Sequence, residues 1–430
     1  MIDFTLTREQ AQLRLGAHDF AKNILAAAPA IYSQYPSQKA RFQSTRPIYR
    51  KAVEAGFIKG QIPAALGGSA GSLINAAILI EELYSVEPSA SLTILGTGLG
   101  LTPLILGGNP EQHERLLKPF LSGDGEPLAS LVHSEPDGTA NWLEKGAPGL
   151  QTTAKKEGED WIINGEKLWT TNSGGWDCKG ADLQCVVCRY SPETDPQDPS
   201  VDPGTLILIL MVTPEEIANN PSDAYLVLDH PELLGHKAAS GPHSRFTGFR
   251  VPGKNLLAVP GEGAAVVERT FGSSAAIVGA MAVGIMRAAF ESGLNFAKSD
   301  TRGGTVPILA RQSVADLLIN IKMRVEAARA LTWKALSCLE NGPGDWKARL
   351  EIALEAKVWC SDQVVGCVID AMKVVGMTSY SKEQPFSRLL EDAACLPLFD
   401  GGNVGIRRRQ IERIFLGEDY QPWAATFKEQ

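Results

Sequence analysis

The sequence predicts an α+β protein that is mostly helical, with its helices and strands in separate parts of the chain. Apolar residues recur at helical spacing over roughly the first 120 residues and again from about residue 262 onward. Between these segments, short apolar or alternating runs bounded by turn residues predict strands. The chain has 430 residues, enough for two or three domains, and we expect them at 1–125, 126–258 and 259–430. This segregation argues against a doubly wound fold, in which strands and helices alternate.

Composition narrows the class of protein. Hydrophobic residues make up 44% of the chain and charged residues 21%, which is ordinary for a globular protein. The 41 Lys and Arg against 49 Asp and Glu give a net charge of −8, so we expect neither nucleic acid nor an anionic membrane as the main partner. The chain has no run of about 18 consecutive apolar residues, so we expect no membrane-spanning helix. Neither end resembles a targeting signal and the seven cysteines are scattered like reduced thiols, so we expect a cytoplasmic protein.

Helices are predicted on both sides of the strand segment. The first follows a capping box at Thr7 to Gln10, in which the threonine hydroxyl and the glutamine amide satisfy free N–H groups of the first turn. Other N-terminal helices are expected at about 46–57, 74–86 and 110–122. Beyond the strands, long helices are expected at about 262–299, 309–340 and 346–375, and a shorter one at about 404–417.

The middle segment carries its strongest signal at Asn164-Gly165. This dipeptide supplies both positive-φ positions of a type I′ turn, so residues 161–163 and 166–169 are expected to form a hairpin. Other strands are expected at 128–133, 150–154, 183–189, 206–212 and 246–252. The acidic segment 191–204 is expected to be an exposed loop, because its four prolines do not fit a packed element.

Two polar segments could face a flat ring. Ser134, Thr139 and Asn141 lie a few residues apart after the first predicted strand, and donors along one edge are what a heteroaromatic cofactor needs. The alternative is an ordinary turn in which serine and asparagine cap the backbone, and the pattern alone favours it. The segment Trp169 to Thr171 offers an aromatic ring and a hydroxyl two positions apart, which could contact the same cofactor ring. Its alternative is a core tryptophan with strand threonines.

No metal site is predicted. Cys185 and Cys188 have the spacing of half a zinc site, but no second pair follows at a suitable distance and the valines between them continue a strand. His133, at the end of an apolar strand, is interpreted as a structural residue rather than a catalytic one. Ser273 and Ser274, inside a long predicted helix, could donate hydrogen bonds to a ligand, whereas the small residues beside them fit tight helix packing equally well.

Asp400 and the arginines after it are the residues that best fit acid–base chemistry. Asp400 precedes two glycines and Asn403, a residue typical of a helix N-terminus, so it is expected in a flexible turn. The positive end of that helix and a nearby arginine would both favour an ionised carboxylate, as a general base requires. Residues 403, 404, 407 and 408 share one helical face, so only one or two of the arginines can face Asp400. A capped helix with a solvated basic face is the alternative, and the pattern alone slightly favours it.

Taken together, these motifs resemble the acyl-CoA dehydrogenase superfamily over nearly the whole chain. The resemblance is carried by His133-Ser-Glu-Pro-Asp-Gly-Thr139, Ile163-Asn-Gly-Glu-Lys-Leu-Trp-Thr-Thr-Asn172, Phe249-Arg-Val-Pro-Gly-Lys-Asn-Leu-Leu257 and a carboxylate before two glycines. It implies an N-terminal helical domain, a β-barrel-like middle domain and a C-terminal four-helix domain, usually in a homotetramer. It also implies that FAD lies between the β domain and the C-terminal helices.

The resemblance implies a set of cofactor-binding residues. Around the flavin ring it places the end of the first strand, the segment after Trp169 and the two glycines after Asp400. These residues are Leu131, Val132, His133, Ser134, Thr139, Ala140, Asn141, Trp169, Thr170, Thr171, Gly401 and Gly402. For the pyrophosphate and adenosine part it implies Arg302, Arg311 and Gln312, and for contact from a neighbouring subunit it implies Lys373, Val374 and Gly376.

A departure from the superfamily pattern narrows the activity. Most acyl-CoA dehydrogenases have Glu-Gly-Thr where this chain has Asp400-Gly401-Gly402, and aspartate is one methylene shorter. The Asp-Gly-Gly-Asn segment with Arg407 after it is similar to the fungal nitroalkane oxidases, as is Ser173-Gly-Gly-Trp-Asp177. This similarity implies FAD-dependent oxidation of neutral nitroalkanes to aldehydes or ketones, with O₂ as the acceptor and with nitrite and hydrogen peroxide as products. Asp400 would take the substrate proton, Arg407 would be its electrostatic partner, and Ser274 would donate near the flavin or Asp400.

Three other functions stay open on the sequence. They are an acyl-CoA dehydrogenase or oxidase with an Asp base, a reduced-flavin-dependent monooxygenase of the same fold, and a catalytically silent helical assembly protein. The retained carboxylate, arginine and hydroxyls argue weakly against the last. Bleaching of bound flavin by nitroethane or by a short acyl-CoA distinguishes the first from the nitroalkane activity.

Overall fold

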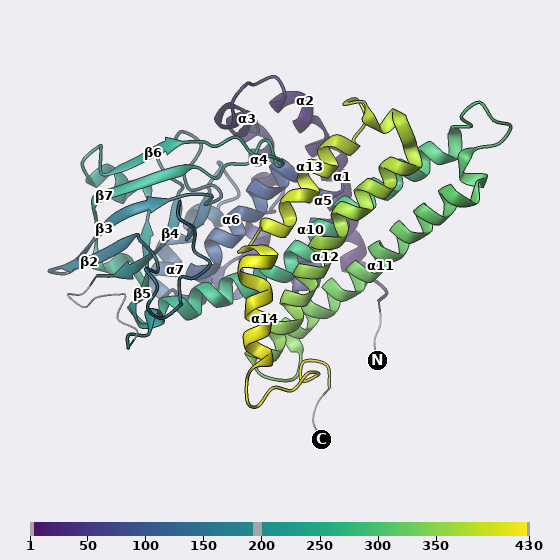
Figure 1. Cartoon of the computed structure of the whole chain (residues 1–430). Coiled ribbons are helices and arrows are strands. Elements are labelled where there is room, and N and C mark those ends of the chain that lie inside the picture. The colour runs from purple at the N-terminus through teal and green to yellow at the C-terminus, as the bar shows by residue number, and fades with distance from the viewer. Residues whose placement is uncertain (1–3, 192–199, 428–430) are drawn as a thin grey trace.

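Helices and strands are segregated along the chain, as predicted, in the computed structural model, which describes residues 4–191 and 200–427 (Figure 1). The first helices are α1 (Arg8–Asn23), α2 (Ala28–Tyr32), α3 (Gln38–Ser44), α4 (Arg46–Glu54), α5 (Leu73–Tyr84), α6 (Pro88–Gly107), α7 (Pro110–Leu116) and α8 (Lys118–Leu121). The strands are β1 (Ala129–Val132), β2 (Thr153–Glu157), β3 (Asp160–Lys167), β4 (Leu183–Tyr190), β5 (Ile207–Val212), β6 (Tyr225–Asp229), β7 (His243–Val251) and β8 (Leu256–Ala258), with α9 (Pro214–Asn219) between β5 and β6. The last helices are α10 (Gly263–Ser299), α11 (Gln312–Asn341), α12 (Trp346–Val375), α13 (Phe386–Cys395) and α14 (Arg408–Phe415).

Most predicted helices are confirmed, and the exceptions have local causes. The capping box at Thr7 and Gln10 is formed, and the segments predicted at 46–57 and 74–86 are α4 and α5. The segment predicted at 110–122 is divided into α7 and α8, because Pro119 lacks the N–H group that a continuous helix needs there. The helix predicted at 404–417 begins instead as a π-helix over Gly402–Arg407, which leads into α14.

Helix α6 is missing from the sequence prediction because it is apolar on nearly every side and has no single hydrophobic face. It also contains Pro103 and several glycines, residues that usually mark turns. The glycines permit close packing instead: a Cβ at Gly100 would lie 2.2 Å from the backbone nitrogen of Ser130 in β1. Helix α6 therefore packs directly on the sheet, and tertiary contact overrides its local signals.

The strands form one mixed sheet in the order β6-β7-β3-β2-β4-β5-β8, with β1 paired in parallel to β4. Burial differs between the strands, since every residue of β1 and β5 is buried whereas β2 is mostly exposed. The buried strands face α6 and the start of α10, which places the C-terminal end of β1 beside the helical part of the molecule.

The predicted hairpin turn at Asn164-Gly165 is wrong. Both residues lie inside β3, which runs without interruption to Lys167, and the turn lies at Gly158, between β2 and β3. The dipeptide instead marks an irregularity in the pairing of β3 with β7, where Gly165 has φ +144° and the Asn164 side chain accepts a hydrogen bond from Gly248. An Asn-Gly pair fits a β-bulge as well as a turn, because both need a glycine conformation.

Long helices form the other half of the molecule (Figure 1). Helices α10, α11 and α12 pack lengthwise against one another, α13 packs on α10 and α12, and α5 lies against α10 and α11. Helices α6 and α10 are long and apolar enough to span a membrane by composition, but 56% and 72% of their most apolar windows are buried against other parts of the protein. Core packing accounts for their composition.

The domain boundaries at 125/126 and 258/259 stay predictions. The described strands all lie between residues 129 and 258, and long helices begin at residue 263. Of the loop predicted at 191–204, residues 192–199 lie outside the described part of the chain.

Candidate active site

Asp400 lies in a sharply turned segment between the end of α13 and the π-helix. Asp400, Gly401 and Gly402 have φ values of +49°, +88° and +72°, three successive residues in the left-handed region. Two glycines adopt this conformation at little cost, whereas for Asp400 it costs on the order of 1 kcal/mol or more. The backbone therefore holds a half-buried carboxylate in a conformation that an unconstrained chain would rarely adopt.

Ser274 on α10 contacts the carboxylate directly. Its Oγ lies 2.6 Å from Oδ2 of Asp400 and 3.1 Å from the Phe271 carbonyl oxygen of the preceding helical turn. A hydroxyl donor at this distance fixes the orientation of the carboxylate. The two residues are 126 positions apart in the sequence, so only the packing of the turn against α10 brings them together.

Arg407 is the arginine that faces Asp400, but it binds the backbone rather than the carboxylate. The buried guanidinium donates from Nε to the main-chain carbonyl oxygen of Asp400 and from Nη1 to Gln410 Oε1 at 2.6 Å. Its carbon Cζ lies 5.4 Å from the ring centroid of Phe271, within cation–π range. Burial lowers the pKa of Arg407, while Asp400 and Glu268 oppose that effect.

The two following arginines point elsewhere. Arg408 pairs with Asp362 of α12 at the surface, with Nη2 and Oδ2 2.9 Å apart. Arg409 donates to the Asn141 side chain and lies 3.6 Å from a carboxylate oxygen of Glu144. The segment 139–141, predicted to bind the cofactor, is thereby connected to the helix that follows Asp400.

The end of β1 approaches the same region. Leu131, Val132 and His133 are buried, and the His133 ring lies 5.6 Å from the Phe271 ring, centroid to centroid. Burial, and then the charge of Lys167, lower the pKa of His133 to about 3, so its imidazole is neutral. Its Nε2 is buried and has no hydrogen-bond partner among the described residues.

Trp169 is neither a strand residue nor a core tryptophan, so the alternative of a core tryptophan with strand threonines is wrong, while contact with a cofactor ring stays a prediction. Strand β3 ends at Lys167, and Trp169 has φ +65° with 53% of its surface exposed. Thr170 is buried and donates to Ser173 Oγ at 2.8 Å, while Thr171 packs against α6 at Gly96. The exposed indole next to buried neighbours leaves an aromatic face free to stack on a ring.

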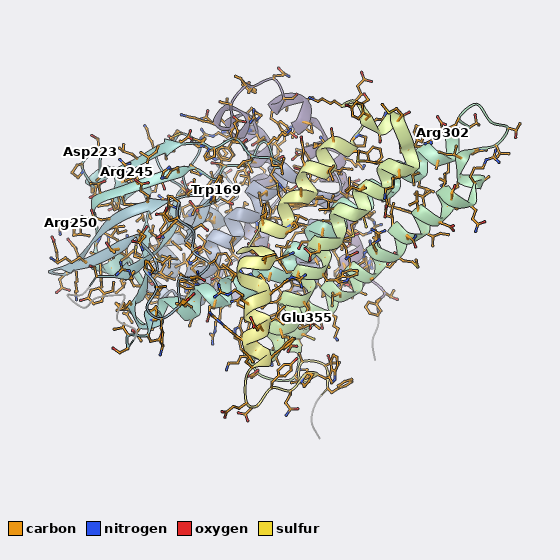
Figure 2. All side chains as sticks on the ribbon, in the orientation of Figure 1. Trp169, Asp223, Arg245, Arg250, Arg302 and Glu355 are labelled. Atoms are coloured by element: carbon orange, nitrogen blue, oxygen red, sulfur yellow. The ribbon has the colours of Figure 1, made fainter. Side chains whose placement is uncertain are left out.

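The predicted pyrophosphate and adenosine residues lie together at the other end of the helical part. Arg302 donates from Nη2 to the Val374 carbonyl oxygen at 2.7 Å and also to that of Val375. Figure 2 shows Trp169 where the sheet meets the helices and Arg302 at the far end of the long helices. Lys373 is exposed and pairs with Asp370, and Arg311 and Gln312 lie at the start of α11. One chain therefore does not bring Arg302 to the ring-facing residues.

Lys357 is not among the residues predicted from the sequence, and Asn403 is predicted only as a helix cap. Lys357 is fully buried on α12, and its Nζ lies 2.5 Å from Asn403 Oδ1. Burial lowers the pKa of Lys357 to about 8, and Asp400 opposes this effect. A signal was present: Lys357 and Ser361 interrupt the apolar residues of this helix at a spacing of four, which places them on one face.

Comparisons with known proteins agree with this geometry. The sequence family described as acyl-CoA dehydrogenase, N-terminal domain, matches residues 7–124, and the family described as acyl-CoA dehydrogenase, C-terminal domain, matches residues 261–416. A nitroalkane oxidase from Fusarium oxysporum is 57% identical, covering 99% of this chain and 98% of its own. One from Podospora anserina is 53% identical, covering 99% of each chain.

A solved structure extends the comparison to an active site. It is a nitroalkane oxidase in which an active-site aspartate is replaced by asparagine, crystallised with 1-nitrooctane. It has a TM-score of 0.97 and 57% identity, covering 99% of this chain and all of its own.

Proposed function

This chain belongs to the acyl-CoA dehydrogenase family, on its nitroalkane oxidase branch, and we infer that it is an FAD-dependent oxidase of neutral nitroalkanes. In the net reaction a nitroalkane, O₂ and water give an aldehyde or ketone, nitrite and hydrogen peroxide. The observation that carries this inference is the 2.6 Å contact between Ser274 and Asp400, which orients a short carboxylate for proton abstraction.

Proton abstraction is the task of Asp400. The hydrogen next to a nitro group is acidic because the nitro group delocalises the resulting charge, so a carboxylate near neutral pH suffices as the base. Ser274 holds the carboxylate from α10, and Arg407 holds the backbone of the same residue. The cationic guanidinium also places positive charge beside a site where the substrate becomes an anion.

The residues around the end of β1 fit a flavin. Trp169 presents an exposed aromatic face. The buried atoms His133 Nε2 and Asn172 Oδ1 have no hydrogen-bond partner among the described residues, as expected if a polar group of the cofactor supplies one. FAD, when bound, accepts the two electrons that the substrate loses. The residues of this chain bind and orient the ring from the β1 side, while α10 and the Asp400 segment supply the base.

We also propose that O₂ reoxidises the flavin and that the enzyme is a cytoplasmic homotetramer. The separation of Arg302 from Trp169 supports the assembly, because a second copy is needed to bring both sets of residues to one cofactor. The seven free thiols are in keeping with a reducing compartment.

Anaerobic mixing tests the proposed reaction. We expect neutral nitroethane to bleach the flavin absorbance of the purified enzyme, and one nitrite to be released per flavin reduced. On admission of air, hydrogen peroxide should form and the absorbance should return. Bleaching by butyryl-CoA but not by nitroethane would assign the chain to acyl-CoA oxidation instead, and a protein without flavin absorbance that binds no added FAD would exclude both.

A further inference from the structure

Lys357 of α12 holds both ends of the segment that carries Asp400. Its Nζ lies 3.3 Å from the main-chain oxygen of Pro397 and 2.5 Å from the side-chain oxygen of Asn403. These two acceptors lie three residues before and three residues after Asp400. A single ammonium group thus links the two ends of the turn by hydrogen bonds.

Asn403 extends this anchor along α12. Its Nδ2 donates to Ser361 Oγ at 2.9 Å and to Asp362 Oδ1 at 2.7 Å, and the residue is 3% exposed. One face of α12, formed by Lys357, Ser361 and Asp362, therefore binds the start of the π-helix, and Asn403 Nδ2 also lies 3.4 Å from the main-chain oxygen of Val358.

The Asp400 turn needs such anchoring because its own backbone is permissive. Gly401 and Gly402 can adopt many conformations, and Asp400 itself is held at φ +49°, which an unconstrained residue would leave. A rotation within this turn would carry the carboxylate away from Ser274, whose position is fixed by α10. Because both ends of the turn are held, the flexible glycine pair keeps one conformation and the carboxylate keeps its position.

The buried ammonium is also a charge beside the base. The charged groups that face Lys357 are Asp362 on its own helix and Asp400 and Arg407 on the opposing segment, while Arg408 neutralises part of Asp362 from the surface. Burial lowers the pKa of Lys357, and the two carboxylates oppose it. The ammonium group is therefore a charge as well as a hydrogen-bond donor at this turn.

We propose that Lys357 is a positioning residue for the base: it fixes the Asp400 turn through Pro397 and Asn403, so that the carboxylate stays in contact with Ser274. The proposal rests on the proposed function, in which Asp400 removes the substrate proton. Lys357 is not a catalytic residue, because its contacts lie with the turn and not with the reacting atoms.

The test compares Lys357→Met with Lys347→Met in the flavin-loaded enzyme. Methionine has an unbranched side chain one atom shorter than that of lysine, with no charge and no donor, and Lys347 is an exposed residue of the same helix. For neutral nitroethane we expect Lys357→Met to lower kcat/KM about 10- to 100-fold, the range that misplacing a reacting group produces. Oxidation of pre-formed ethyl nitronate, which needs no base, should change far less.

A second variant tests whether another cationic donor restores the anchor. Lys357→Arg keeps a cation with N–H donors, so it should recover part of the nitroethane rate that Lys357→Met loses. Equal kinetics for Lys357→Met and the parent would overturn the proposal, as would equal losses with nitroethane and the nitronate. If Lys357→Met yields no flavin-containing protein, Asn403→Leu removes one anchor and keeps the charge. It should slow nitroethane oxidation selectively, and an unchanged rate would overturn the proposal.

The proposed function can fail independently of this inference. If the parent enzyme bleaches with a short acyl-CoA and not with nitroethane, the nitroalkane activity is wrong, whereas normal nitroethane oxidation by Lys357→Met refutes only the role of the lysine.

Discussion

At the scale of single residues, three side chains hold Asp400 and the turn that carries it. Ser274 contacts the carboxylate, Arg407 contacts the carbonyl oxygen of the same residue, and Lys357 holds the ends of the turn. The sequence pattern makes the aspartate and the arginines candidates, and the resemblance to the superfamily assigns them their roles. Neither reveals that Arg407 binds the backbone, because the direction of a side chain depends on the π-helix, which has no sequence signal.

The first prediction concerns Asp400 itself. Asp400→Asn keeps the shape of the side chain but removes the base, so neutral nitroethane should be oxidised at least ~100-fold more slowly. The nitronate anion has already lost its proton and should be oxidised at a rate much nearer that of the parent. Steady-state rates for both substrates on both proteins measure the difference. Equal losses with the two substrates would show that Asp400 maintains the structure of the site instead of taking a proton.

The second prediction tests whether the planar guanidinium of Arg407 matters beyond its charge. Arg407→Lys preserves a cation, but an ammonium cannot contact the Asp400 carbonyl oxygen and Gln410 at once from a rigid planar group. We therefore expect a lower kcat with nitroethane and nearly full flavin content, measured by turnover and by flavin absorbance. Parental kinetics would mean that charge alone suffices, and Arg408→Lys, at the surface pair with Asp362, is the matched control.

At the scale of secondary structure elements, the sequence predicts amphipathic helices better than buried ones. Helices α4, α5, α10, α11 and α12 lie close to their predicted positions because their apolar residues recur at helical spacing. Helix α6 is not predicted, because it is buried on nearly every side and its apolar residues show no helical periodicity. The predicted hairpin at Asn164-Gly165 is wrong, because the same dipeptide fits a β-bulge as well as a turn. The contact of Ser274 with Asp400 depends on the packing of α10, and local patterns carry no information about it.

Strands β1, β3 and β4 are connected by a buried lysine that can be tested separately from the active site. Lys167 at the end of β3 is fully buried and donates to Glu135 Oε1 at 2.9 Å, to the His133 carbonyl oxygen at 2.9 Å and to the Val187 carbonyl oxygen at 2.8 Å. Lys167→Met leaves the Glu135 carboxylate buried without its cation, so we expect a loss of about 3–5 kcal/mol in stability. Urea midpoints of the flavin-containing protein measure it, with the exposed Lys155→Met as the control.

The same pair predicts a pH dependence of that loss. Burial alone would raise the pKa of Glu135, but Lys167 and the N–H groups of Gln151 and Thr152 outweigh it and leave the pKa below its ordinary value. A lowered carboxyl pKa stabilises the folded state above the unfolded pKa of about 4.3, and this contribution is lost as pH falls through the folded pKa. The stability difference between the parent and Lys167→Met should thus be largest near neutral pH and shrink below about pH 4. A difference that does not vary with pH would assign the loss to packing.

At the scale of the whole molecule, the two parts of the proposed cofactor-binding set lie apart. The residues proposed to face the ring gather where the sheet meets α10, and Arg302 with Val374 and Gly376 lies at the far end of the long helices (Figure 2). The superfamily resemblance implies both sets, and the three-dimensional arrangement shows that they are separated within one chain.

This separation predicts that flavin content follows assembly. We expect the flavin-containing enzyme to sediment as a tetramer, and Arg302→Ala to lose FAD on dilution more readily than the parent. Sedimentation velocity with absorbance detection at the flavin bands measures both. A monomer that sediments with bound FAD would contradict the assembly and leave Arg302 with a local role, namely capping the carbonyl oxygens at the end of α12.

The separation of the two residue sets has a genetic consequence. In the proposed assembly each reaction centre takes its base from one polypeptide and its phosphate-binding arginine from a neighbour. Two defective alleles, one encoding Asp400→Asn and the other Arg302→Ala, would then complement each other when co-expressed. In a reciprocal pair of the two chains, one centre collects both lesions while the other inherits an intact aspartate and an intact arginine, so a heterozygous cell would recover more activity than either homozygote has.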